Sequence, residues 1–135
     1  MIKENIKKNT KVKITPTQLE ILEHRLTYPD GIAEALNDSG LTVSEDDVER
    51  AANRLLVMAR AGVIDWAELD DLDKAVLWDS LDGSTFMALA DSAVDDPSFV
   101  PGVTRLQYWN YSRSFESLAD KLQAVGMDKV NCGYC

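Results

Sequence analysis

The chain has 135 residues, of which 45% are hydrophobic and 27% charged, and its net charge is −9. This composition predicts one globular domain, or a small domain with an appended helical region, and no apolar run approaches the roughly 18 residues that a bilayer requires. Because the first residues also lack the apolar segment of a secretory signal, we expect a cytoplasmic protein.

The charge is distributed unevenly along the chain. Residues 1–14 carry five lysines and one glutamate, whereas residues 41–82 hold eleven acidic and four basic side chains. A strongly negative surface repels phosphate and attracts basic partners through its long-range field. We therefore expect a basic leader over residues 1–14, flexible or strand-like, followed by a region that favours a protein partner with a basic surface.

Signals for the first two helices follow this leader. Residues 15–18 read Thr-Pro-Thr-Gln, a capping box with proline in the first turn. Apolar side chains then repeat at helical spacing, namely Leu19, Leu22 and Leu26. The Pro-Asp-Gly sequence at 29–31 breaks the chain, Asp30 can cap a short second helix over residues 32–36, and residues 37–40 predict a turn.

The third predicted helix begins after Ser44, a good N-cap, and ends at Gly62, where a left-handed residue is needed. Acidic residues in its first turn suit the positive end of the helix dipole. Its apolar stripe consists of Val48, Ala52, Leu55 and Ala59, with Ala51 and Leu56 beside it. Residues 63–66 predict a short strand, the start of a wing.

The second half of the chain is also predicted to be helical. A fourth helix over residues 68–81 has apolar side chains directed inward, namely Leu69, Leu72, Val76 and Leu77. A shorter fifth helix over 84–94 and a proline-containing loop over 95–102 follow. The fold class is therefore mainly α with about six helices: a winged helix-turn-helix-like region over 15–66, a helical region over 67–126 and a tail over 127–135.

The last predicted helix runs from Thr104 to Gly126 and carries a long aromatic and aliphatic stripe. The stripe steps alternately by three and four residues, as in helices that pack along their length on another helix: Tyr108, Tyr111, Phe115, Leu118, Leu122 and Val125. All of these except Val125 are candidate residues for a homodimer interface. Trp109 points about 100° away from the stripe, so it lies either in the core or at a contact surface.

Residues 16–66 resemble the winged helix-turn-helix domain of bacterial and phage transcription regulators. Residues 18–22 and 32–36 stand at its first and second helices, and residues 43–55 and 61–64 stand at its recognition helix and the following strand. The resemblance implies that the third helix enters the major groove and that the wing contacts the DNA backbone. The base-reading positions that it implies are Glu45, Asp46, Glu49, Arg50, Asn53 and Arg54.

The acidity of this helix conflicts with DNA binding, because affinity for DNA comes largely from lysines and arginines that neutralise phosphates. We therefore expect a non-enzymatic acidic protein that inhibits or modulates a nucleic-acid-handling complex. By analogy, small phage proteins that mimic DNA, including inhibitors of restriction or CRISPR systems, act in this way. The predicted partner-binding residues are Glu45, Asp46, Asp47, Glu49, Asp70, Asp71, Asp73 and Trp109.

Two other hypotheses stay open. The first is a transcriptional regulator that uses its lysine-rich leader and four residues of the third helix to bind DNA, namely Arg50, Asn53, Arg54 and Arg60. The second is a structural protein without a charge-driven partner, in which the acidic turn only caps a helix.

Catalysis and cofactors have little support in the sequence. His24 is the single histidine, and the sequence places no Ser, Cys or Asp beside it to form a catalytic group. We therefore expect that the protein is not an enzyme. The acidic clusters lack the spacing of a calcium loop, and we expect no cofactor or metal. Cys132 and Cys135 have zinc-knuckle spacing, but four ligands are needed, so a frayed tail with free thiols is favoured over an inter-chain zinc site or disulfide.

Overall fold

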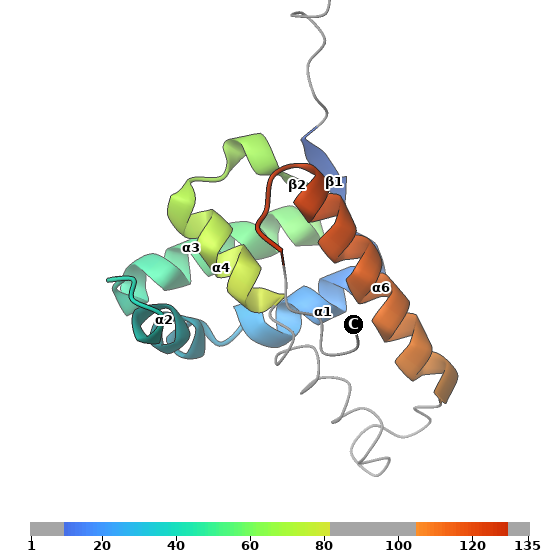
Figure 1. Cartoon of the computed structure of the whole chain (residues 1–135), viewed down its shortest axis with the longest axis horizontal. Helices are drawn as coiled ribbons and strands as arrows, with labels where there is room; N and C mark the ends of the chain where they lie inside the picture. The colour runs from blue at the N-terminus through green and yellow to red at the C-terminus, as the bar shows by residue number, and fades with distance from the viewer. Residues whose placement is uncertain (1–9, 82–104, 130–135) are drawn as a thin grey trace, which may run out of the picture.

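The computed structural model describes residues 10–81 and 105–129, with backbone only for residues 105–112. These residues are mainly helical, with five α-helices and one antiparallel pair of short strands, which confirms the mainly-α class (Figure 1). In chain order the elements are β1 (Lys11–Lys13), α1 (Pro16–Leu26), α2 (Pro29–Asp38), α3 (Glu45–Arg60), β2 (Val63–Asp65), the 3₁₀ turn η2 (Trp66–Glu68), α4 (Asp71–Ser80) and α6 (Arg105–Ala124). The predicted helix at 84–94 and loop at 95–102 lie outside the described residues.

The N-terminal caps of α1 and α3 form as the sequence predicts. The backbone N–H of Gln18 donates to Thr15 Oγ1 at 3.2 Å, and the Gln18 side chain accepts from the Thr15 N–H at 3.1 Å. At α3 the backbone N–H of Asp47 donates to Ser44 Oγ at 3.1 Å. These bonds satisfy N–H groups that have no partner inside the helix.

The bounds of α2 and α4 differ from the prediction. The second helix begins at Pro29 and ends at Asp38, so Asp30 lies in its first turn instead of capping it, and the helix continues into the predicted turn. Proline fits the first helical position because its missing N–H would have no partner there. The fourth helix begins at Asp71 instead of residue 68, because residues 66–68 form the turn η2, which Asp65 caps through the N–H of Ala67.

The core lies between α1, α2, α3 and α4. Every side chain of the predicted α3 stripe is buried: Val48, Ala51, Ala52, Leu55, Leu56 and Ala59. On the α4 side Leu69, Val76 and Leu77 are buried as predicted, while Leu72 is only half-buried. Arg25 of α1 links α1 to α4 and α2. Its Nε donates to the buried Asp79 of α4 at 3.1 Å, and its Nη2 donates to the Gly31 carbonyl of α2 at 3.2 Å.

The strand after α3 forms, but its partner is not a wing strand. Residues 63–65 pair antiparallel with β1, with Val12 opposite Ile64, and both of these side chains are buried. Residues 11–13 therefore belong to the fold as a strand, which is one of the two forms expected for the leader. Within residues 10–81 no second strand follows β2, because the chain turns directly into η2 and α4.

Helix α6 crosses one side of the molecule, against α1 (Figure 1). Phe115, Leu118 and Leu122 are buried inside this single chain, which corrects their prediction as dimer-interface residues. The described part of the stripe packs in the core on the side where α6 contacts α1. Lys121 of α6 stabilises this contact by donating hydrogen bonds to the Lys13 carbonyl at 2.5 Å and to Gln18 Oε1 at 3.1 Å. Its pKa is lowered by burial and, to a smaller extent, by the charge of Lys13.

The side chains of Tyr108, Trp109 and Tyr111 lie outside the described residues, and so do Cys132 and Cys135. Among the helices that are described, none combines the length and apolar character needed to cross a membrane.

Two glycines with positive φ allow a stability test. Gly62 ends α3 at φ +92°, and an added Cβ there would have no neighbour within 4 Å; Gly126 has φ +124°, and an added Cβ would lie 3.1 Å from Trp66 Nε1. We expect Gly62→Ala to lower the free energy of unfolding by about 1 kcal/mol through backbone strain alone, and Gly126→Ala by about 2 kcal/mol because the indole must also move. Urea titration of both variants checks this order, and equal losses would contradict the predicted crowding at Trp66.

Candidate protein-binding surface on helix α3

The first two turns of α3 present carboxylates to solvent. Glu45, Asp46 and Glu49 are exposed, and the backbone that carries them is held by the Ser44 cap. Asp47, between them, is half-buried, and its carboxylate accepts a hydrogen bond from Arg50 in the next turn. The structure therefore brings together three of the four predicted α3 acids as a solvent-facing group, which we call the α3 acidic turn (Glu45, Asp46 and Glu49).

The arginines of α3 are each paired with an acid of the same chain. Arg50 pairs with Asp47 on its own helix, and Arg60 donates to Glu23 of α1 through Nε at 3.1 Å and Nη2 at 3.0 Å. Both pairs are exposed, so each contributes little to stability. They nevertheless reduce the positive potential that the outer face of α3 would offer to a phosphate.

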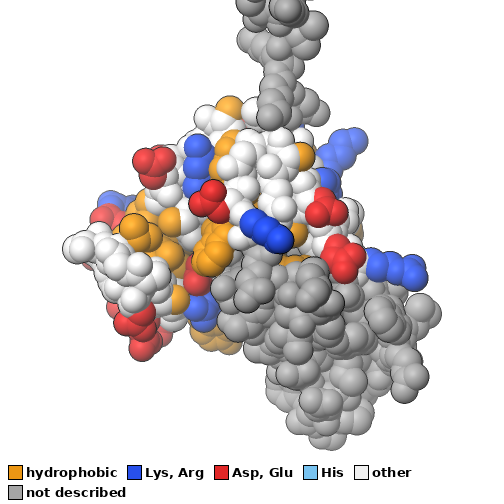
Figure 2. Space-filling model, in the orientation of Figure 1, with side chains coloured by type: hydrophobic (Ala, Val, Ile, Leu, Met, Phe, Trp, Pro, Cys, Tyr) orange, Lys and Arg blue, Asp and Glu red, His pale blue; other side chains and the backbone are white. Residues whose placement is uncertain are grey.

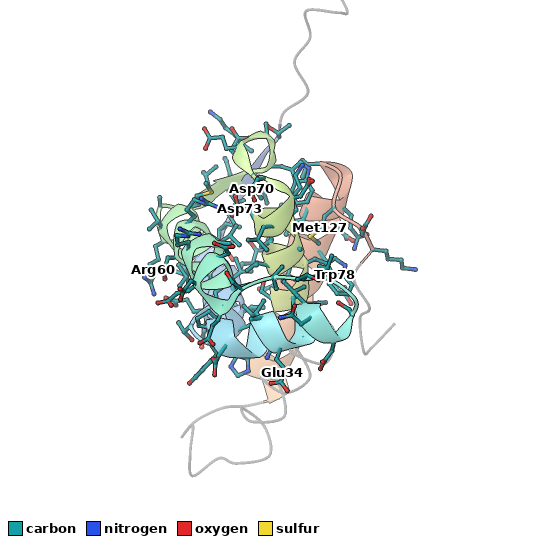
Figure 3. All side chains as sticks on the ribbon, turned by 90° about the vertical axis from the view of Figure 1, so that its left-hand side faces the viewer. Glu34, Arg60, Asp70, Asp73, Trp78 and Met127 are labelled. Carbon is teal, nitrogen blue, oxygen red and sulfur yellow. The ribbon has the colours of Figure 1, made fainter. Side chains whose placement is uncertain are left out.

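Arg54 makes the most extensive of these pairs. Its Nη2 and Nε donate to Asp73 Oδ1 at 2.5 and 3.2 Å, and its Nη2 also lies 3.5 Å from Asp70 Oδ2. The hydrogen bond and then the charge of Asp73 raise the pKa of the Arg54 guanidinium. Figure 3 shows Asp70 and Asp73 together at the beginning of α4.

The predicted acidic group on α4 is therefore only partly available to a partner. Asp73 is 2% exposed, because its carboxylate is turned inward to bind Arg54 and the Asp70 backbone N–H, so its prediction as a partner-binding residue is wrong. Asp70 and Asp71 are exposed. Asp70 also caps α4 by accepting from the Asp73 N–H at 2.8 Å, so Asp71 is the member of this group that most resembles the α3 acidic turn.

A shallow hollow lies farther along the outer face of α3. Its volume is about 440 Å³, and its lining combines the predicted DNA-reading positions with two apolar side chains: Arg50, Asn53, Arg54, Val57 and Met58. Val57 is 68% exposed, the largest value among the exposed large hydrophobic side chains of the described residues. The signal in the sequence that could have identified Val57 is its position outside the apolar stripe of the helix.

The described residues also place His24 and the side chains that could bind a metal ion. His24 is half-buried on α1, where burial and then the charge of Arg25 lower its pKa, so it is neutral near pH 7. Within residues 10–81 and 105–129 no group of three His, Cys, Asp or Glu side chains is placed to hold a metal ion.

Comparison of the chain with protein-family models, with curated proteins and with solved structures finds no match. The resemblance to winged helix-turn-helix regulators therefore rests on the residue pattern alone.

Proposed function

We propose that this chain is a non-enzymatic binding protein whose α3 acidic turn binds a basic surface of a nucleic-acid-handling protein. The observation that carries the proposal is the contrast along one helix. Glu45, Asp46 and Glu49 face solvent, while Arg50, Arg54 and Arg60 are each paired with a carboxylate of the chain itself. A basic protein surface complements this arrangement, whereas a duplex would meet uncompensated negative charge.

Helix stabilisation accounts for only part of the acidic turn. Acids in a first turn gain from the helix dipole, typically about 0.3–1 kcal/mol each. Asp47 has a structural role of this kind, because it follows the cap and pairs with Arg50. Glu49 lies beyond the first turn, where the dipole effect falls off, yet it adds to the same exposed group. The clustering of exposed acids is what a binding surface requires and a cap does not.

A charge-reversal pair tests this proposal. We expect the double variant Asp46→Lys, Glu49→Lys to lose about tenfold or more in affinity for basic nucleic-acid-binding proteins, because close charge pairs across interfaces couple by about 1.5 kcal/mol or more each. The measurement is affinity capture from a lysate at low and high salt, followed by titration of the captured protein.

The matched control is Glu116→Lys, Asp120→Lys on α6, where both acids are exposed and the change in net charge is the same. If this control variant retains its affinity, the loss in the α3 variant is due to the position of the acids on α3 and not to the change in net charge. An equal loss of affinity in both double variants, or no loss in either, would contradict a role of the α3 acidic turn in binding.

Sequence-specific DNA binding is the second candidate function. The observation in its favour is that the Arg50 side chain is 73% exposed in a surface ion pair, which is weak enough to be exchanged for a phosphate. Asn53 is exposed beside it and could hydrogen-bond an adenine edge. In this alternative Arg54 and Arg60 would have to leave their own carboxylates before they could contact DNA.

A further inference from the structure

A larger pocket lies on a different face of the molecule. Its volume is about 540 Å³, within the range of small-molecule sites, and its walls come from the end of α2, from η2 and α4, and from residues 126–129. Figure 3 places Trp78 and Met127 on the opposite side of the view from Arg60 of α3. Figure 2 views the face that carries α4, where hydrophobic side chains gather among charged ones. No residue of the α3 acidic turn lines this pocket.

The aromatic walls of this pocket are fixed by contacts within the chain. The Trp78 indole Nε1 donates to the Lys129 carbonyl at 3.2 Å. The Trp66 indole packs so closely on Gly126 that a side chain there would crowd it. Met127, which also lines the pocket, is 6% exposed, and its N–H donates to the Leu122 carbonyl at 3.0 Å. A pocket with ordered walls binds a ligand without first losing side-chain entropy.

Two lysines, Lys74 and Lys129, line this pocket, and Lys74 is held against its aromatic wall. Lys74 Nζ lies 5.0 Å from the centroid of the Trp66 ring, a cation–π contact that holds the ammonium at the pocket surface. An ammonium has three hydrogen-bond donors, and a ring contact leaves them available for an anion. Lys74 also occupies one face of Trp66, which disfavours a second cation at that ring.

We propose that this pocket binds a planar aromatic molecule with a single anionic group, such as an aromatic carboxylate. The ring lies against the Trp66 and Trp78 indoles, and the carboxylate accepts from Lys74 Nζ. Asp71 and Asp128, which also line the pocket, disfavour a second anionic group and can accept from a hydroxyl or amino substituent of the ligand. The proposal does not depend on the function proposed for α3.

Three probes that share one ring system test this assignment: naphthoate, naphthamide and naphthylmethylammonium. Each is titrated into ¹⁵N-labelled full-length protein, and the three tryptophan indole N–H signals are assigned with single Trp→Phe variants. We expect naphthoate to bind most tightly and to shift the Trp66 and Trp78 signals. Tightest binding of the ammonium probe, equal binding of all three, or shifts confined to Trp109 would overturn the proposal.

The variant Lys74→Gln distinguishes the contribution of the Lys74–carboxylate ion pair to binding from that of ring stacking. We expect it to weaken naphthoate binding about tenfold, the usual contribution of a hydrogen bond to a charged group, and to leave naphthamide binding nearly unchanged. Arg113→Gln removes the same charge from an exposed site outside the pocket and should leave both affinities unchanged. Unchanged naphthoate affinity in Lys74→Gln, with a wild-type backbone spectrum, would refute the role of Lys74.

Discussion

Phe115→Ala is expected to lower the free energy of unfolding by about 3–5 kcal/mol, the usual loss when a buried phenylalanine is truncated. Phe115 is 1% exposed on α6, in the same core as Leu118 and Leu122. Because domains of this size have about 5–15 kcal/mol of stability, the variant would be close to the limit of folding at 37 °C. Urea unfolding followed by circular dichroism measures the loss.

Tyr28→Ala is the matched control for Phe115→Ala. It also truncates an aromatic ring, but Tyr28 is 62% exposed, so we expect a change within about 0.5 kcal/mol. The pair also tests the correction to the dimer prediction. If Phe115 lay at an interface between copies, its truncation would change the sedimentation coefficient and make stability depend on protein concentration. We expect neither effect.

Asp73→Ala is expected to lower the free energy of unfolding by about 2 kcal/mol. The substitution removes the acceptor for the Asp70 N–H, half of the capping box of α4, and the acceptor for two Arg54 hydrogen bonds. A lost cap contributes about 1 kcal/mol. The remaining loss of stability comes from the hydrogen bonds between Arg54 and Asp73. This contribution is small for a charged pair because the Arg54 side chain is 51% exposed and can be solvated by water instead.

Asp71→Ala is the control that measures the helix-dipole contribution without the hydrogen bonds of Asp73. Asp71 lies in the same first turn of α4 but is exposed, so we expect a loss of about 0.5 kcal/mol from the dipole alone. Thermal unfolding of both variants under identical conditions gives the comparison. A loss in Asp73→Ala no larger than in Asp71→Ala would show that the Arg54–Asp73 contact contributes nothing to stability.

Local features of this fold were predictable from sequence, because their determinants are neighbours in the chain. The caps at Thr15 and Ser44 and the buried stripe of α3 follow from residue type and helical spacing. The partner of β2 was not predictable in this way. Residues 63–65 read as a strand, but pairing with Lys11–Lys13 joins segments about fifty residues apart, and no local pattern specifies that choice.

The candidate site shows the same limit. The sequence identified an acidic first turn on α3 and arginines behind it, but not which carboxylates the arginines bind. Arg54 and Asp73 are 19 residues apart and meet only because α4 packs on α3. The periodicity of α6 likewise showed that Phe115, Leu118 and Leu122 need an apolar partner, and only the fold shows that α1 lies against this helix.

Titration of a fluorescently labelled duplex with the full-length protein at low salt, followed by anisotropy, tests the central claim most directly. If the carboxylates of α3 face outward and its arginines are held by the chain itself, no saturable binding occurs even under conditions that favour electrostatic contacts with phosphate. A saturable, salt-sensitive complex of the wild type with one duplex sequence, weakened by Arg50→Gln, would contradict the account.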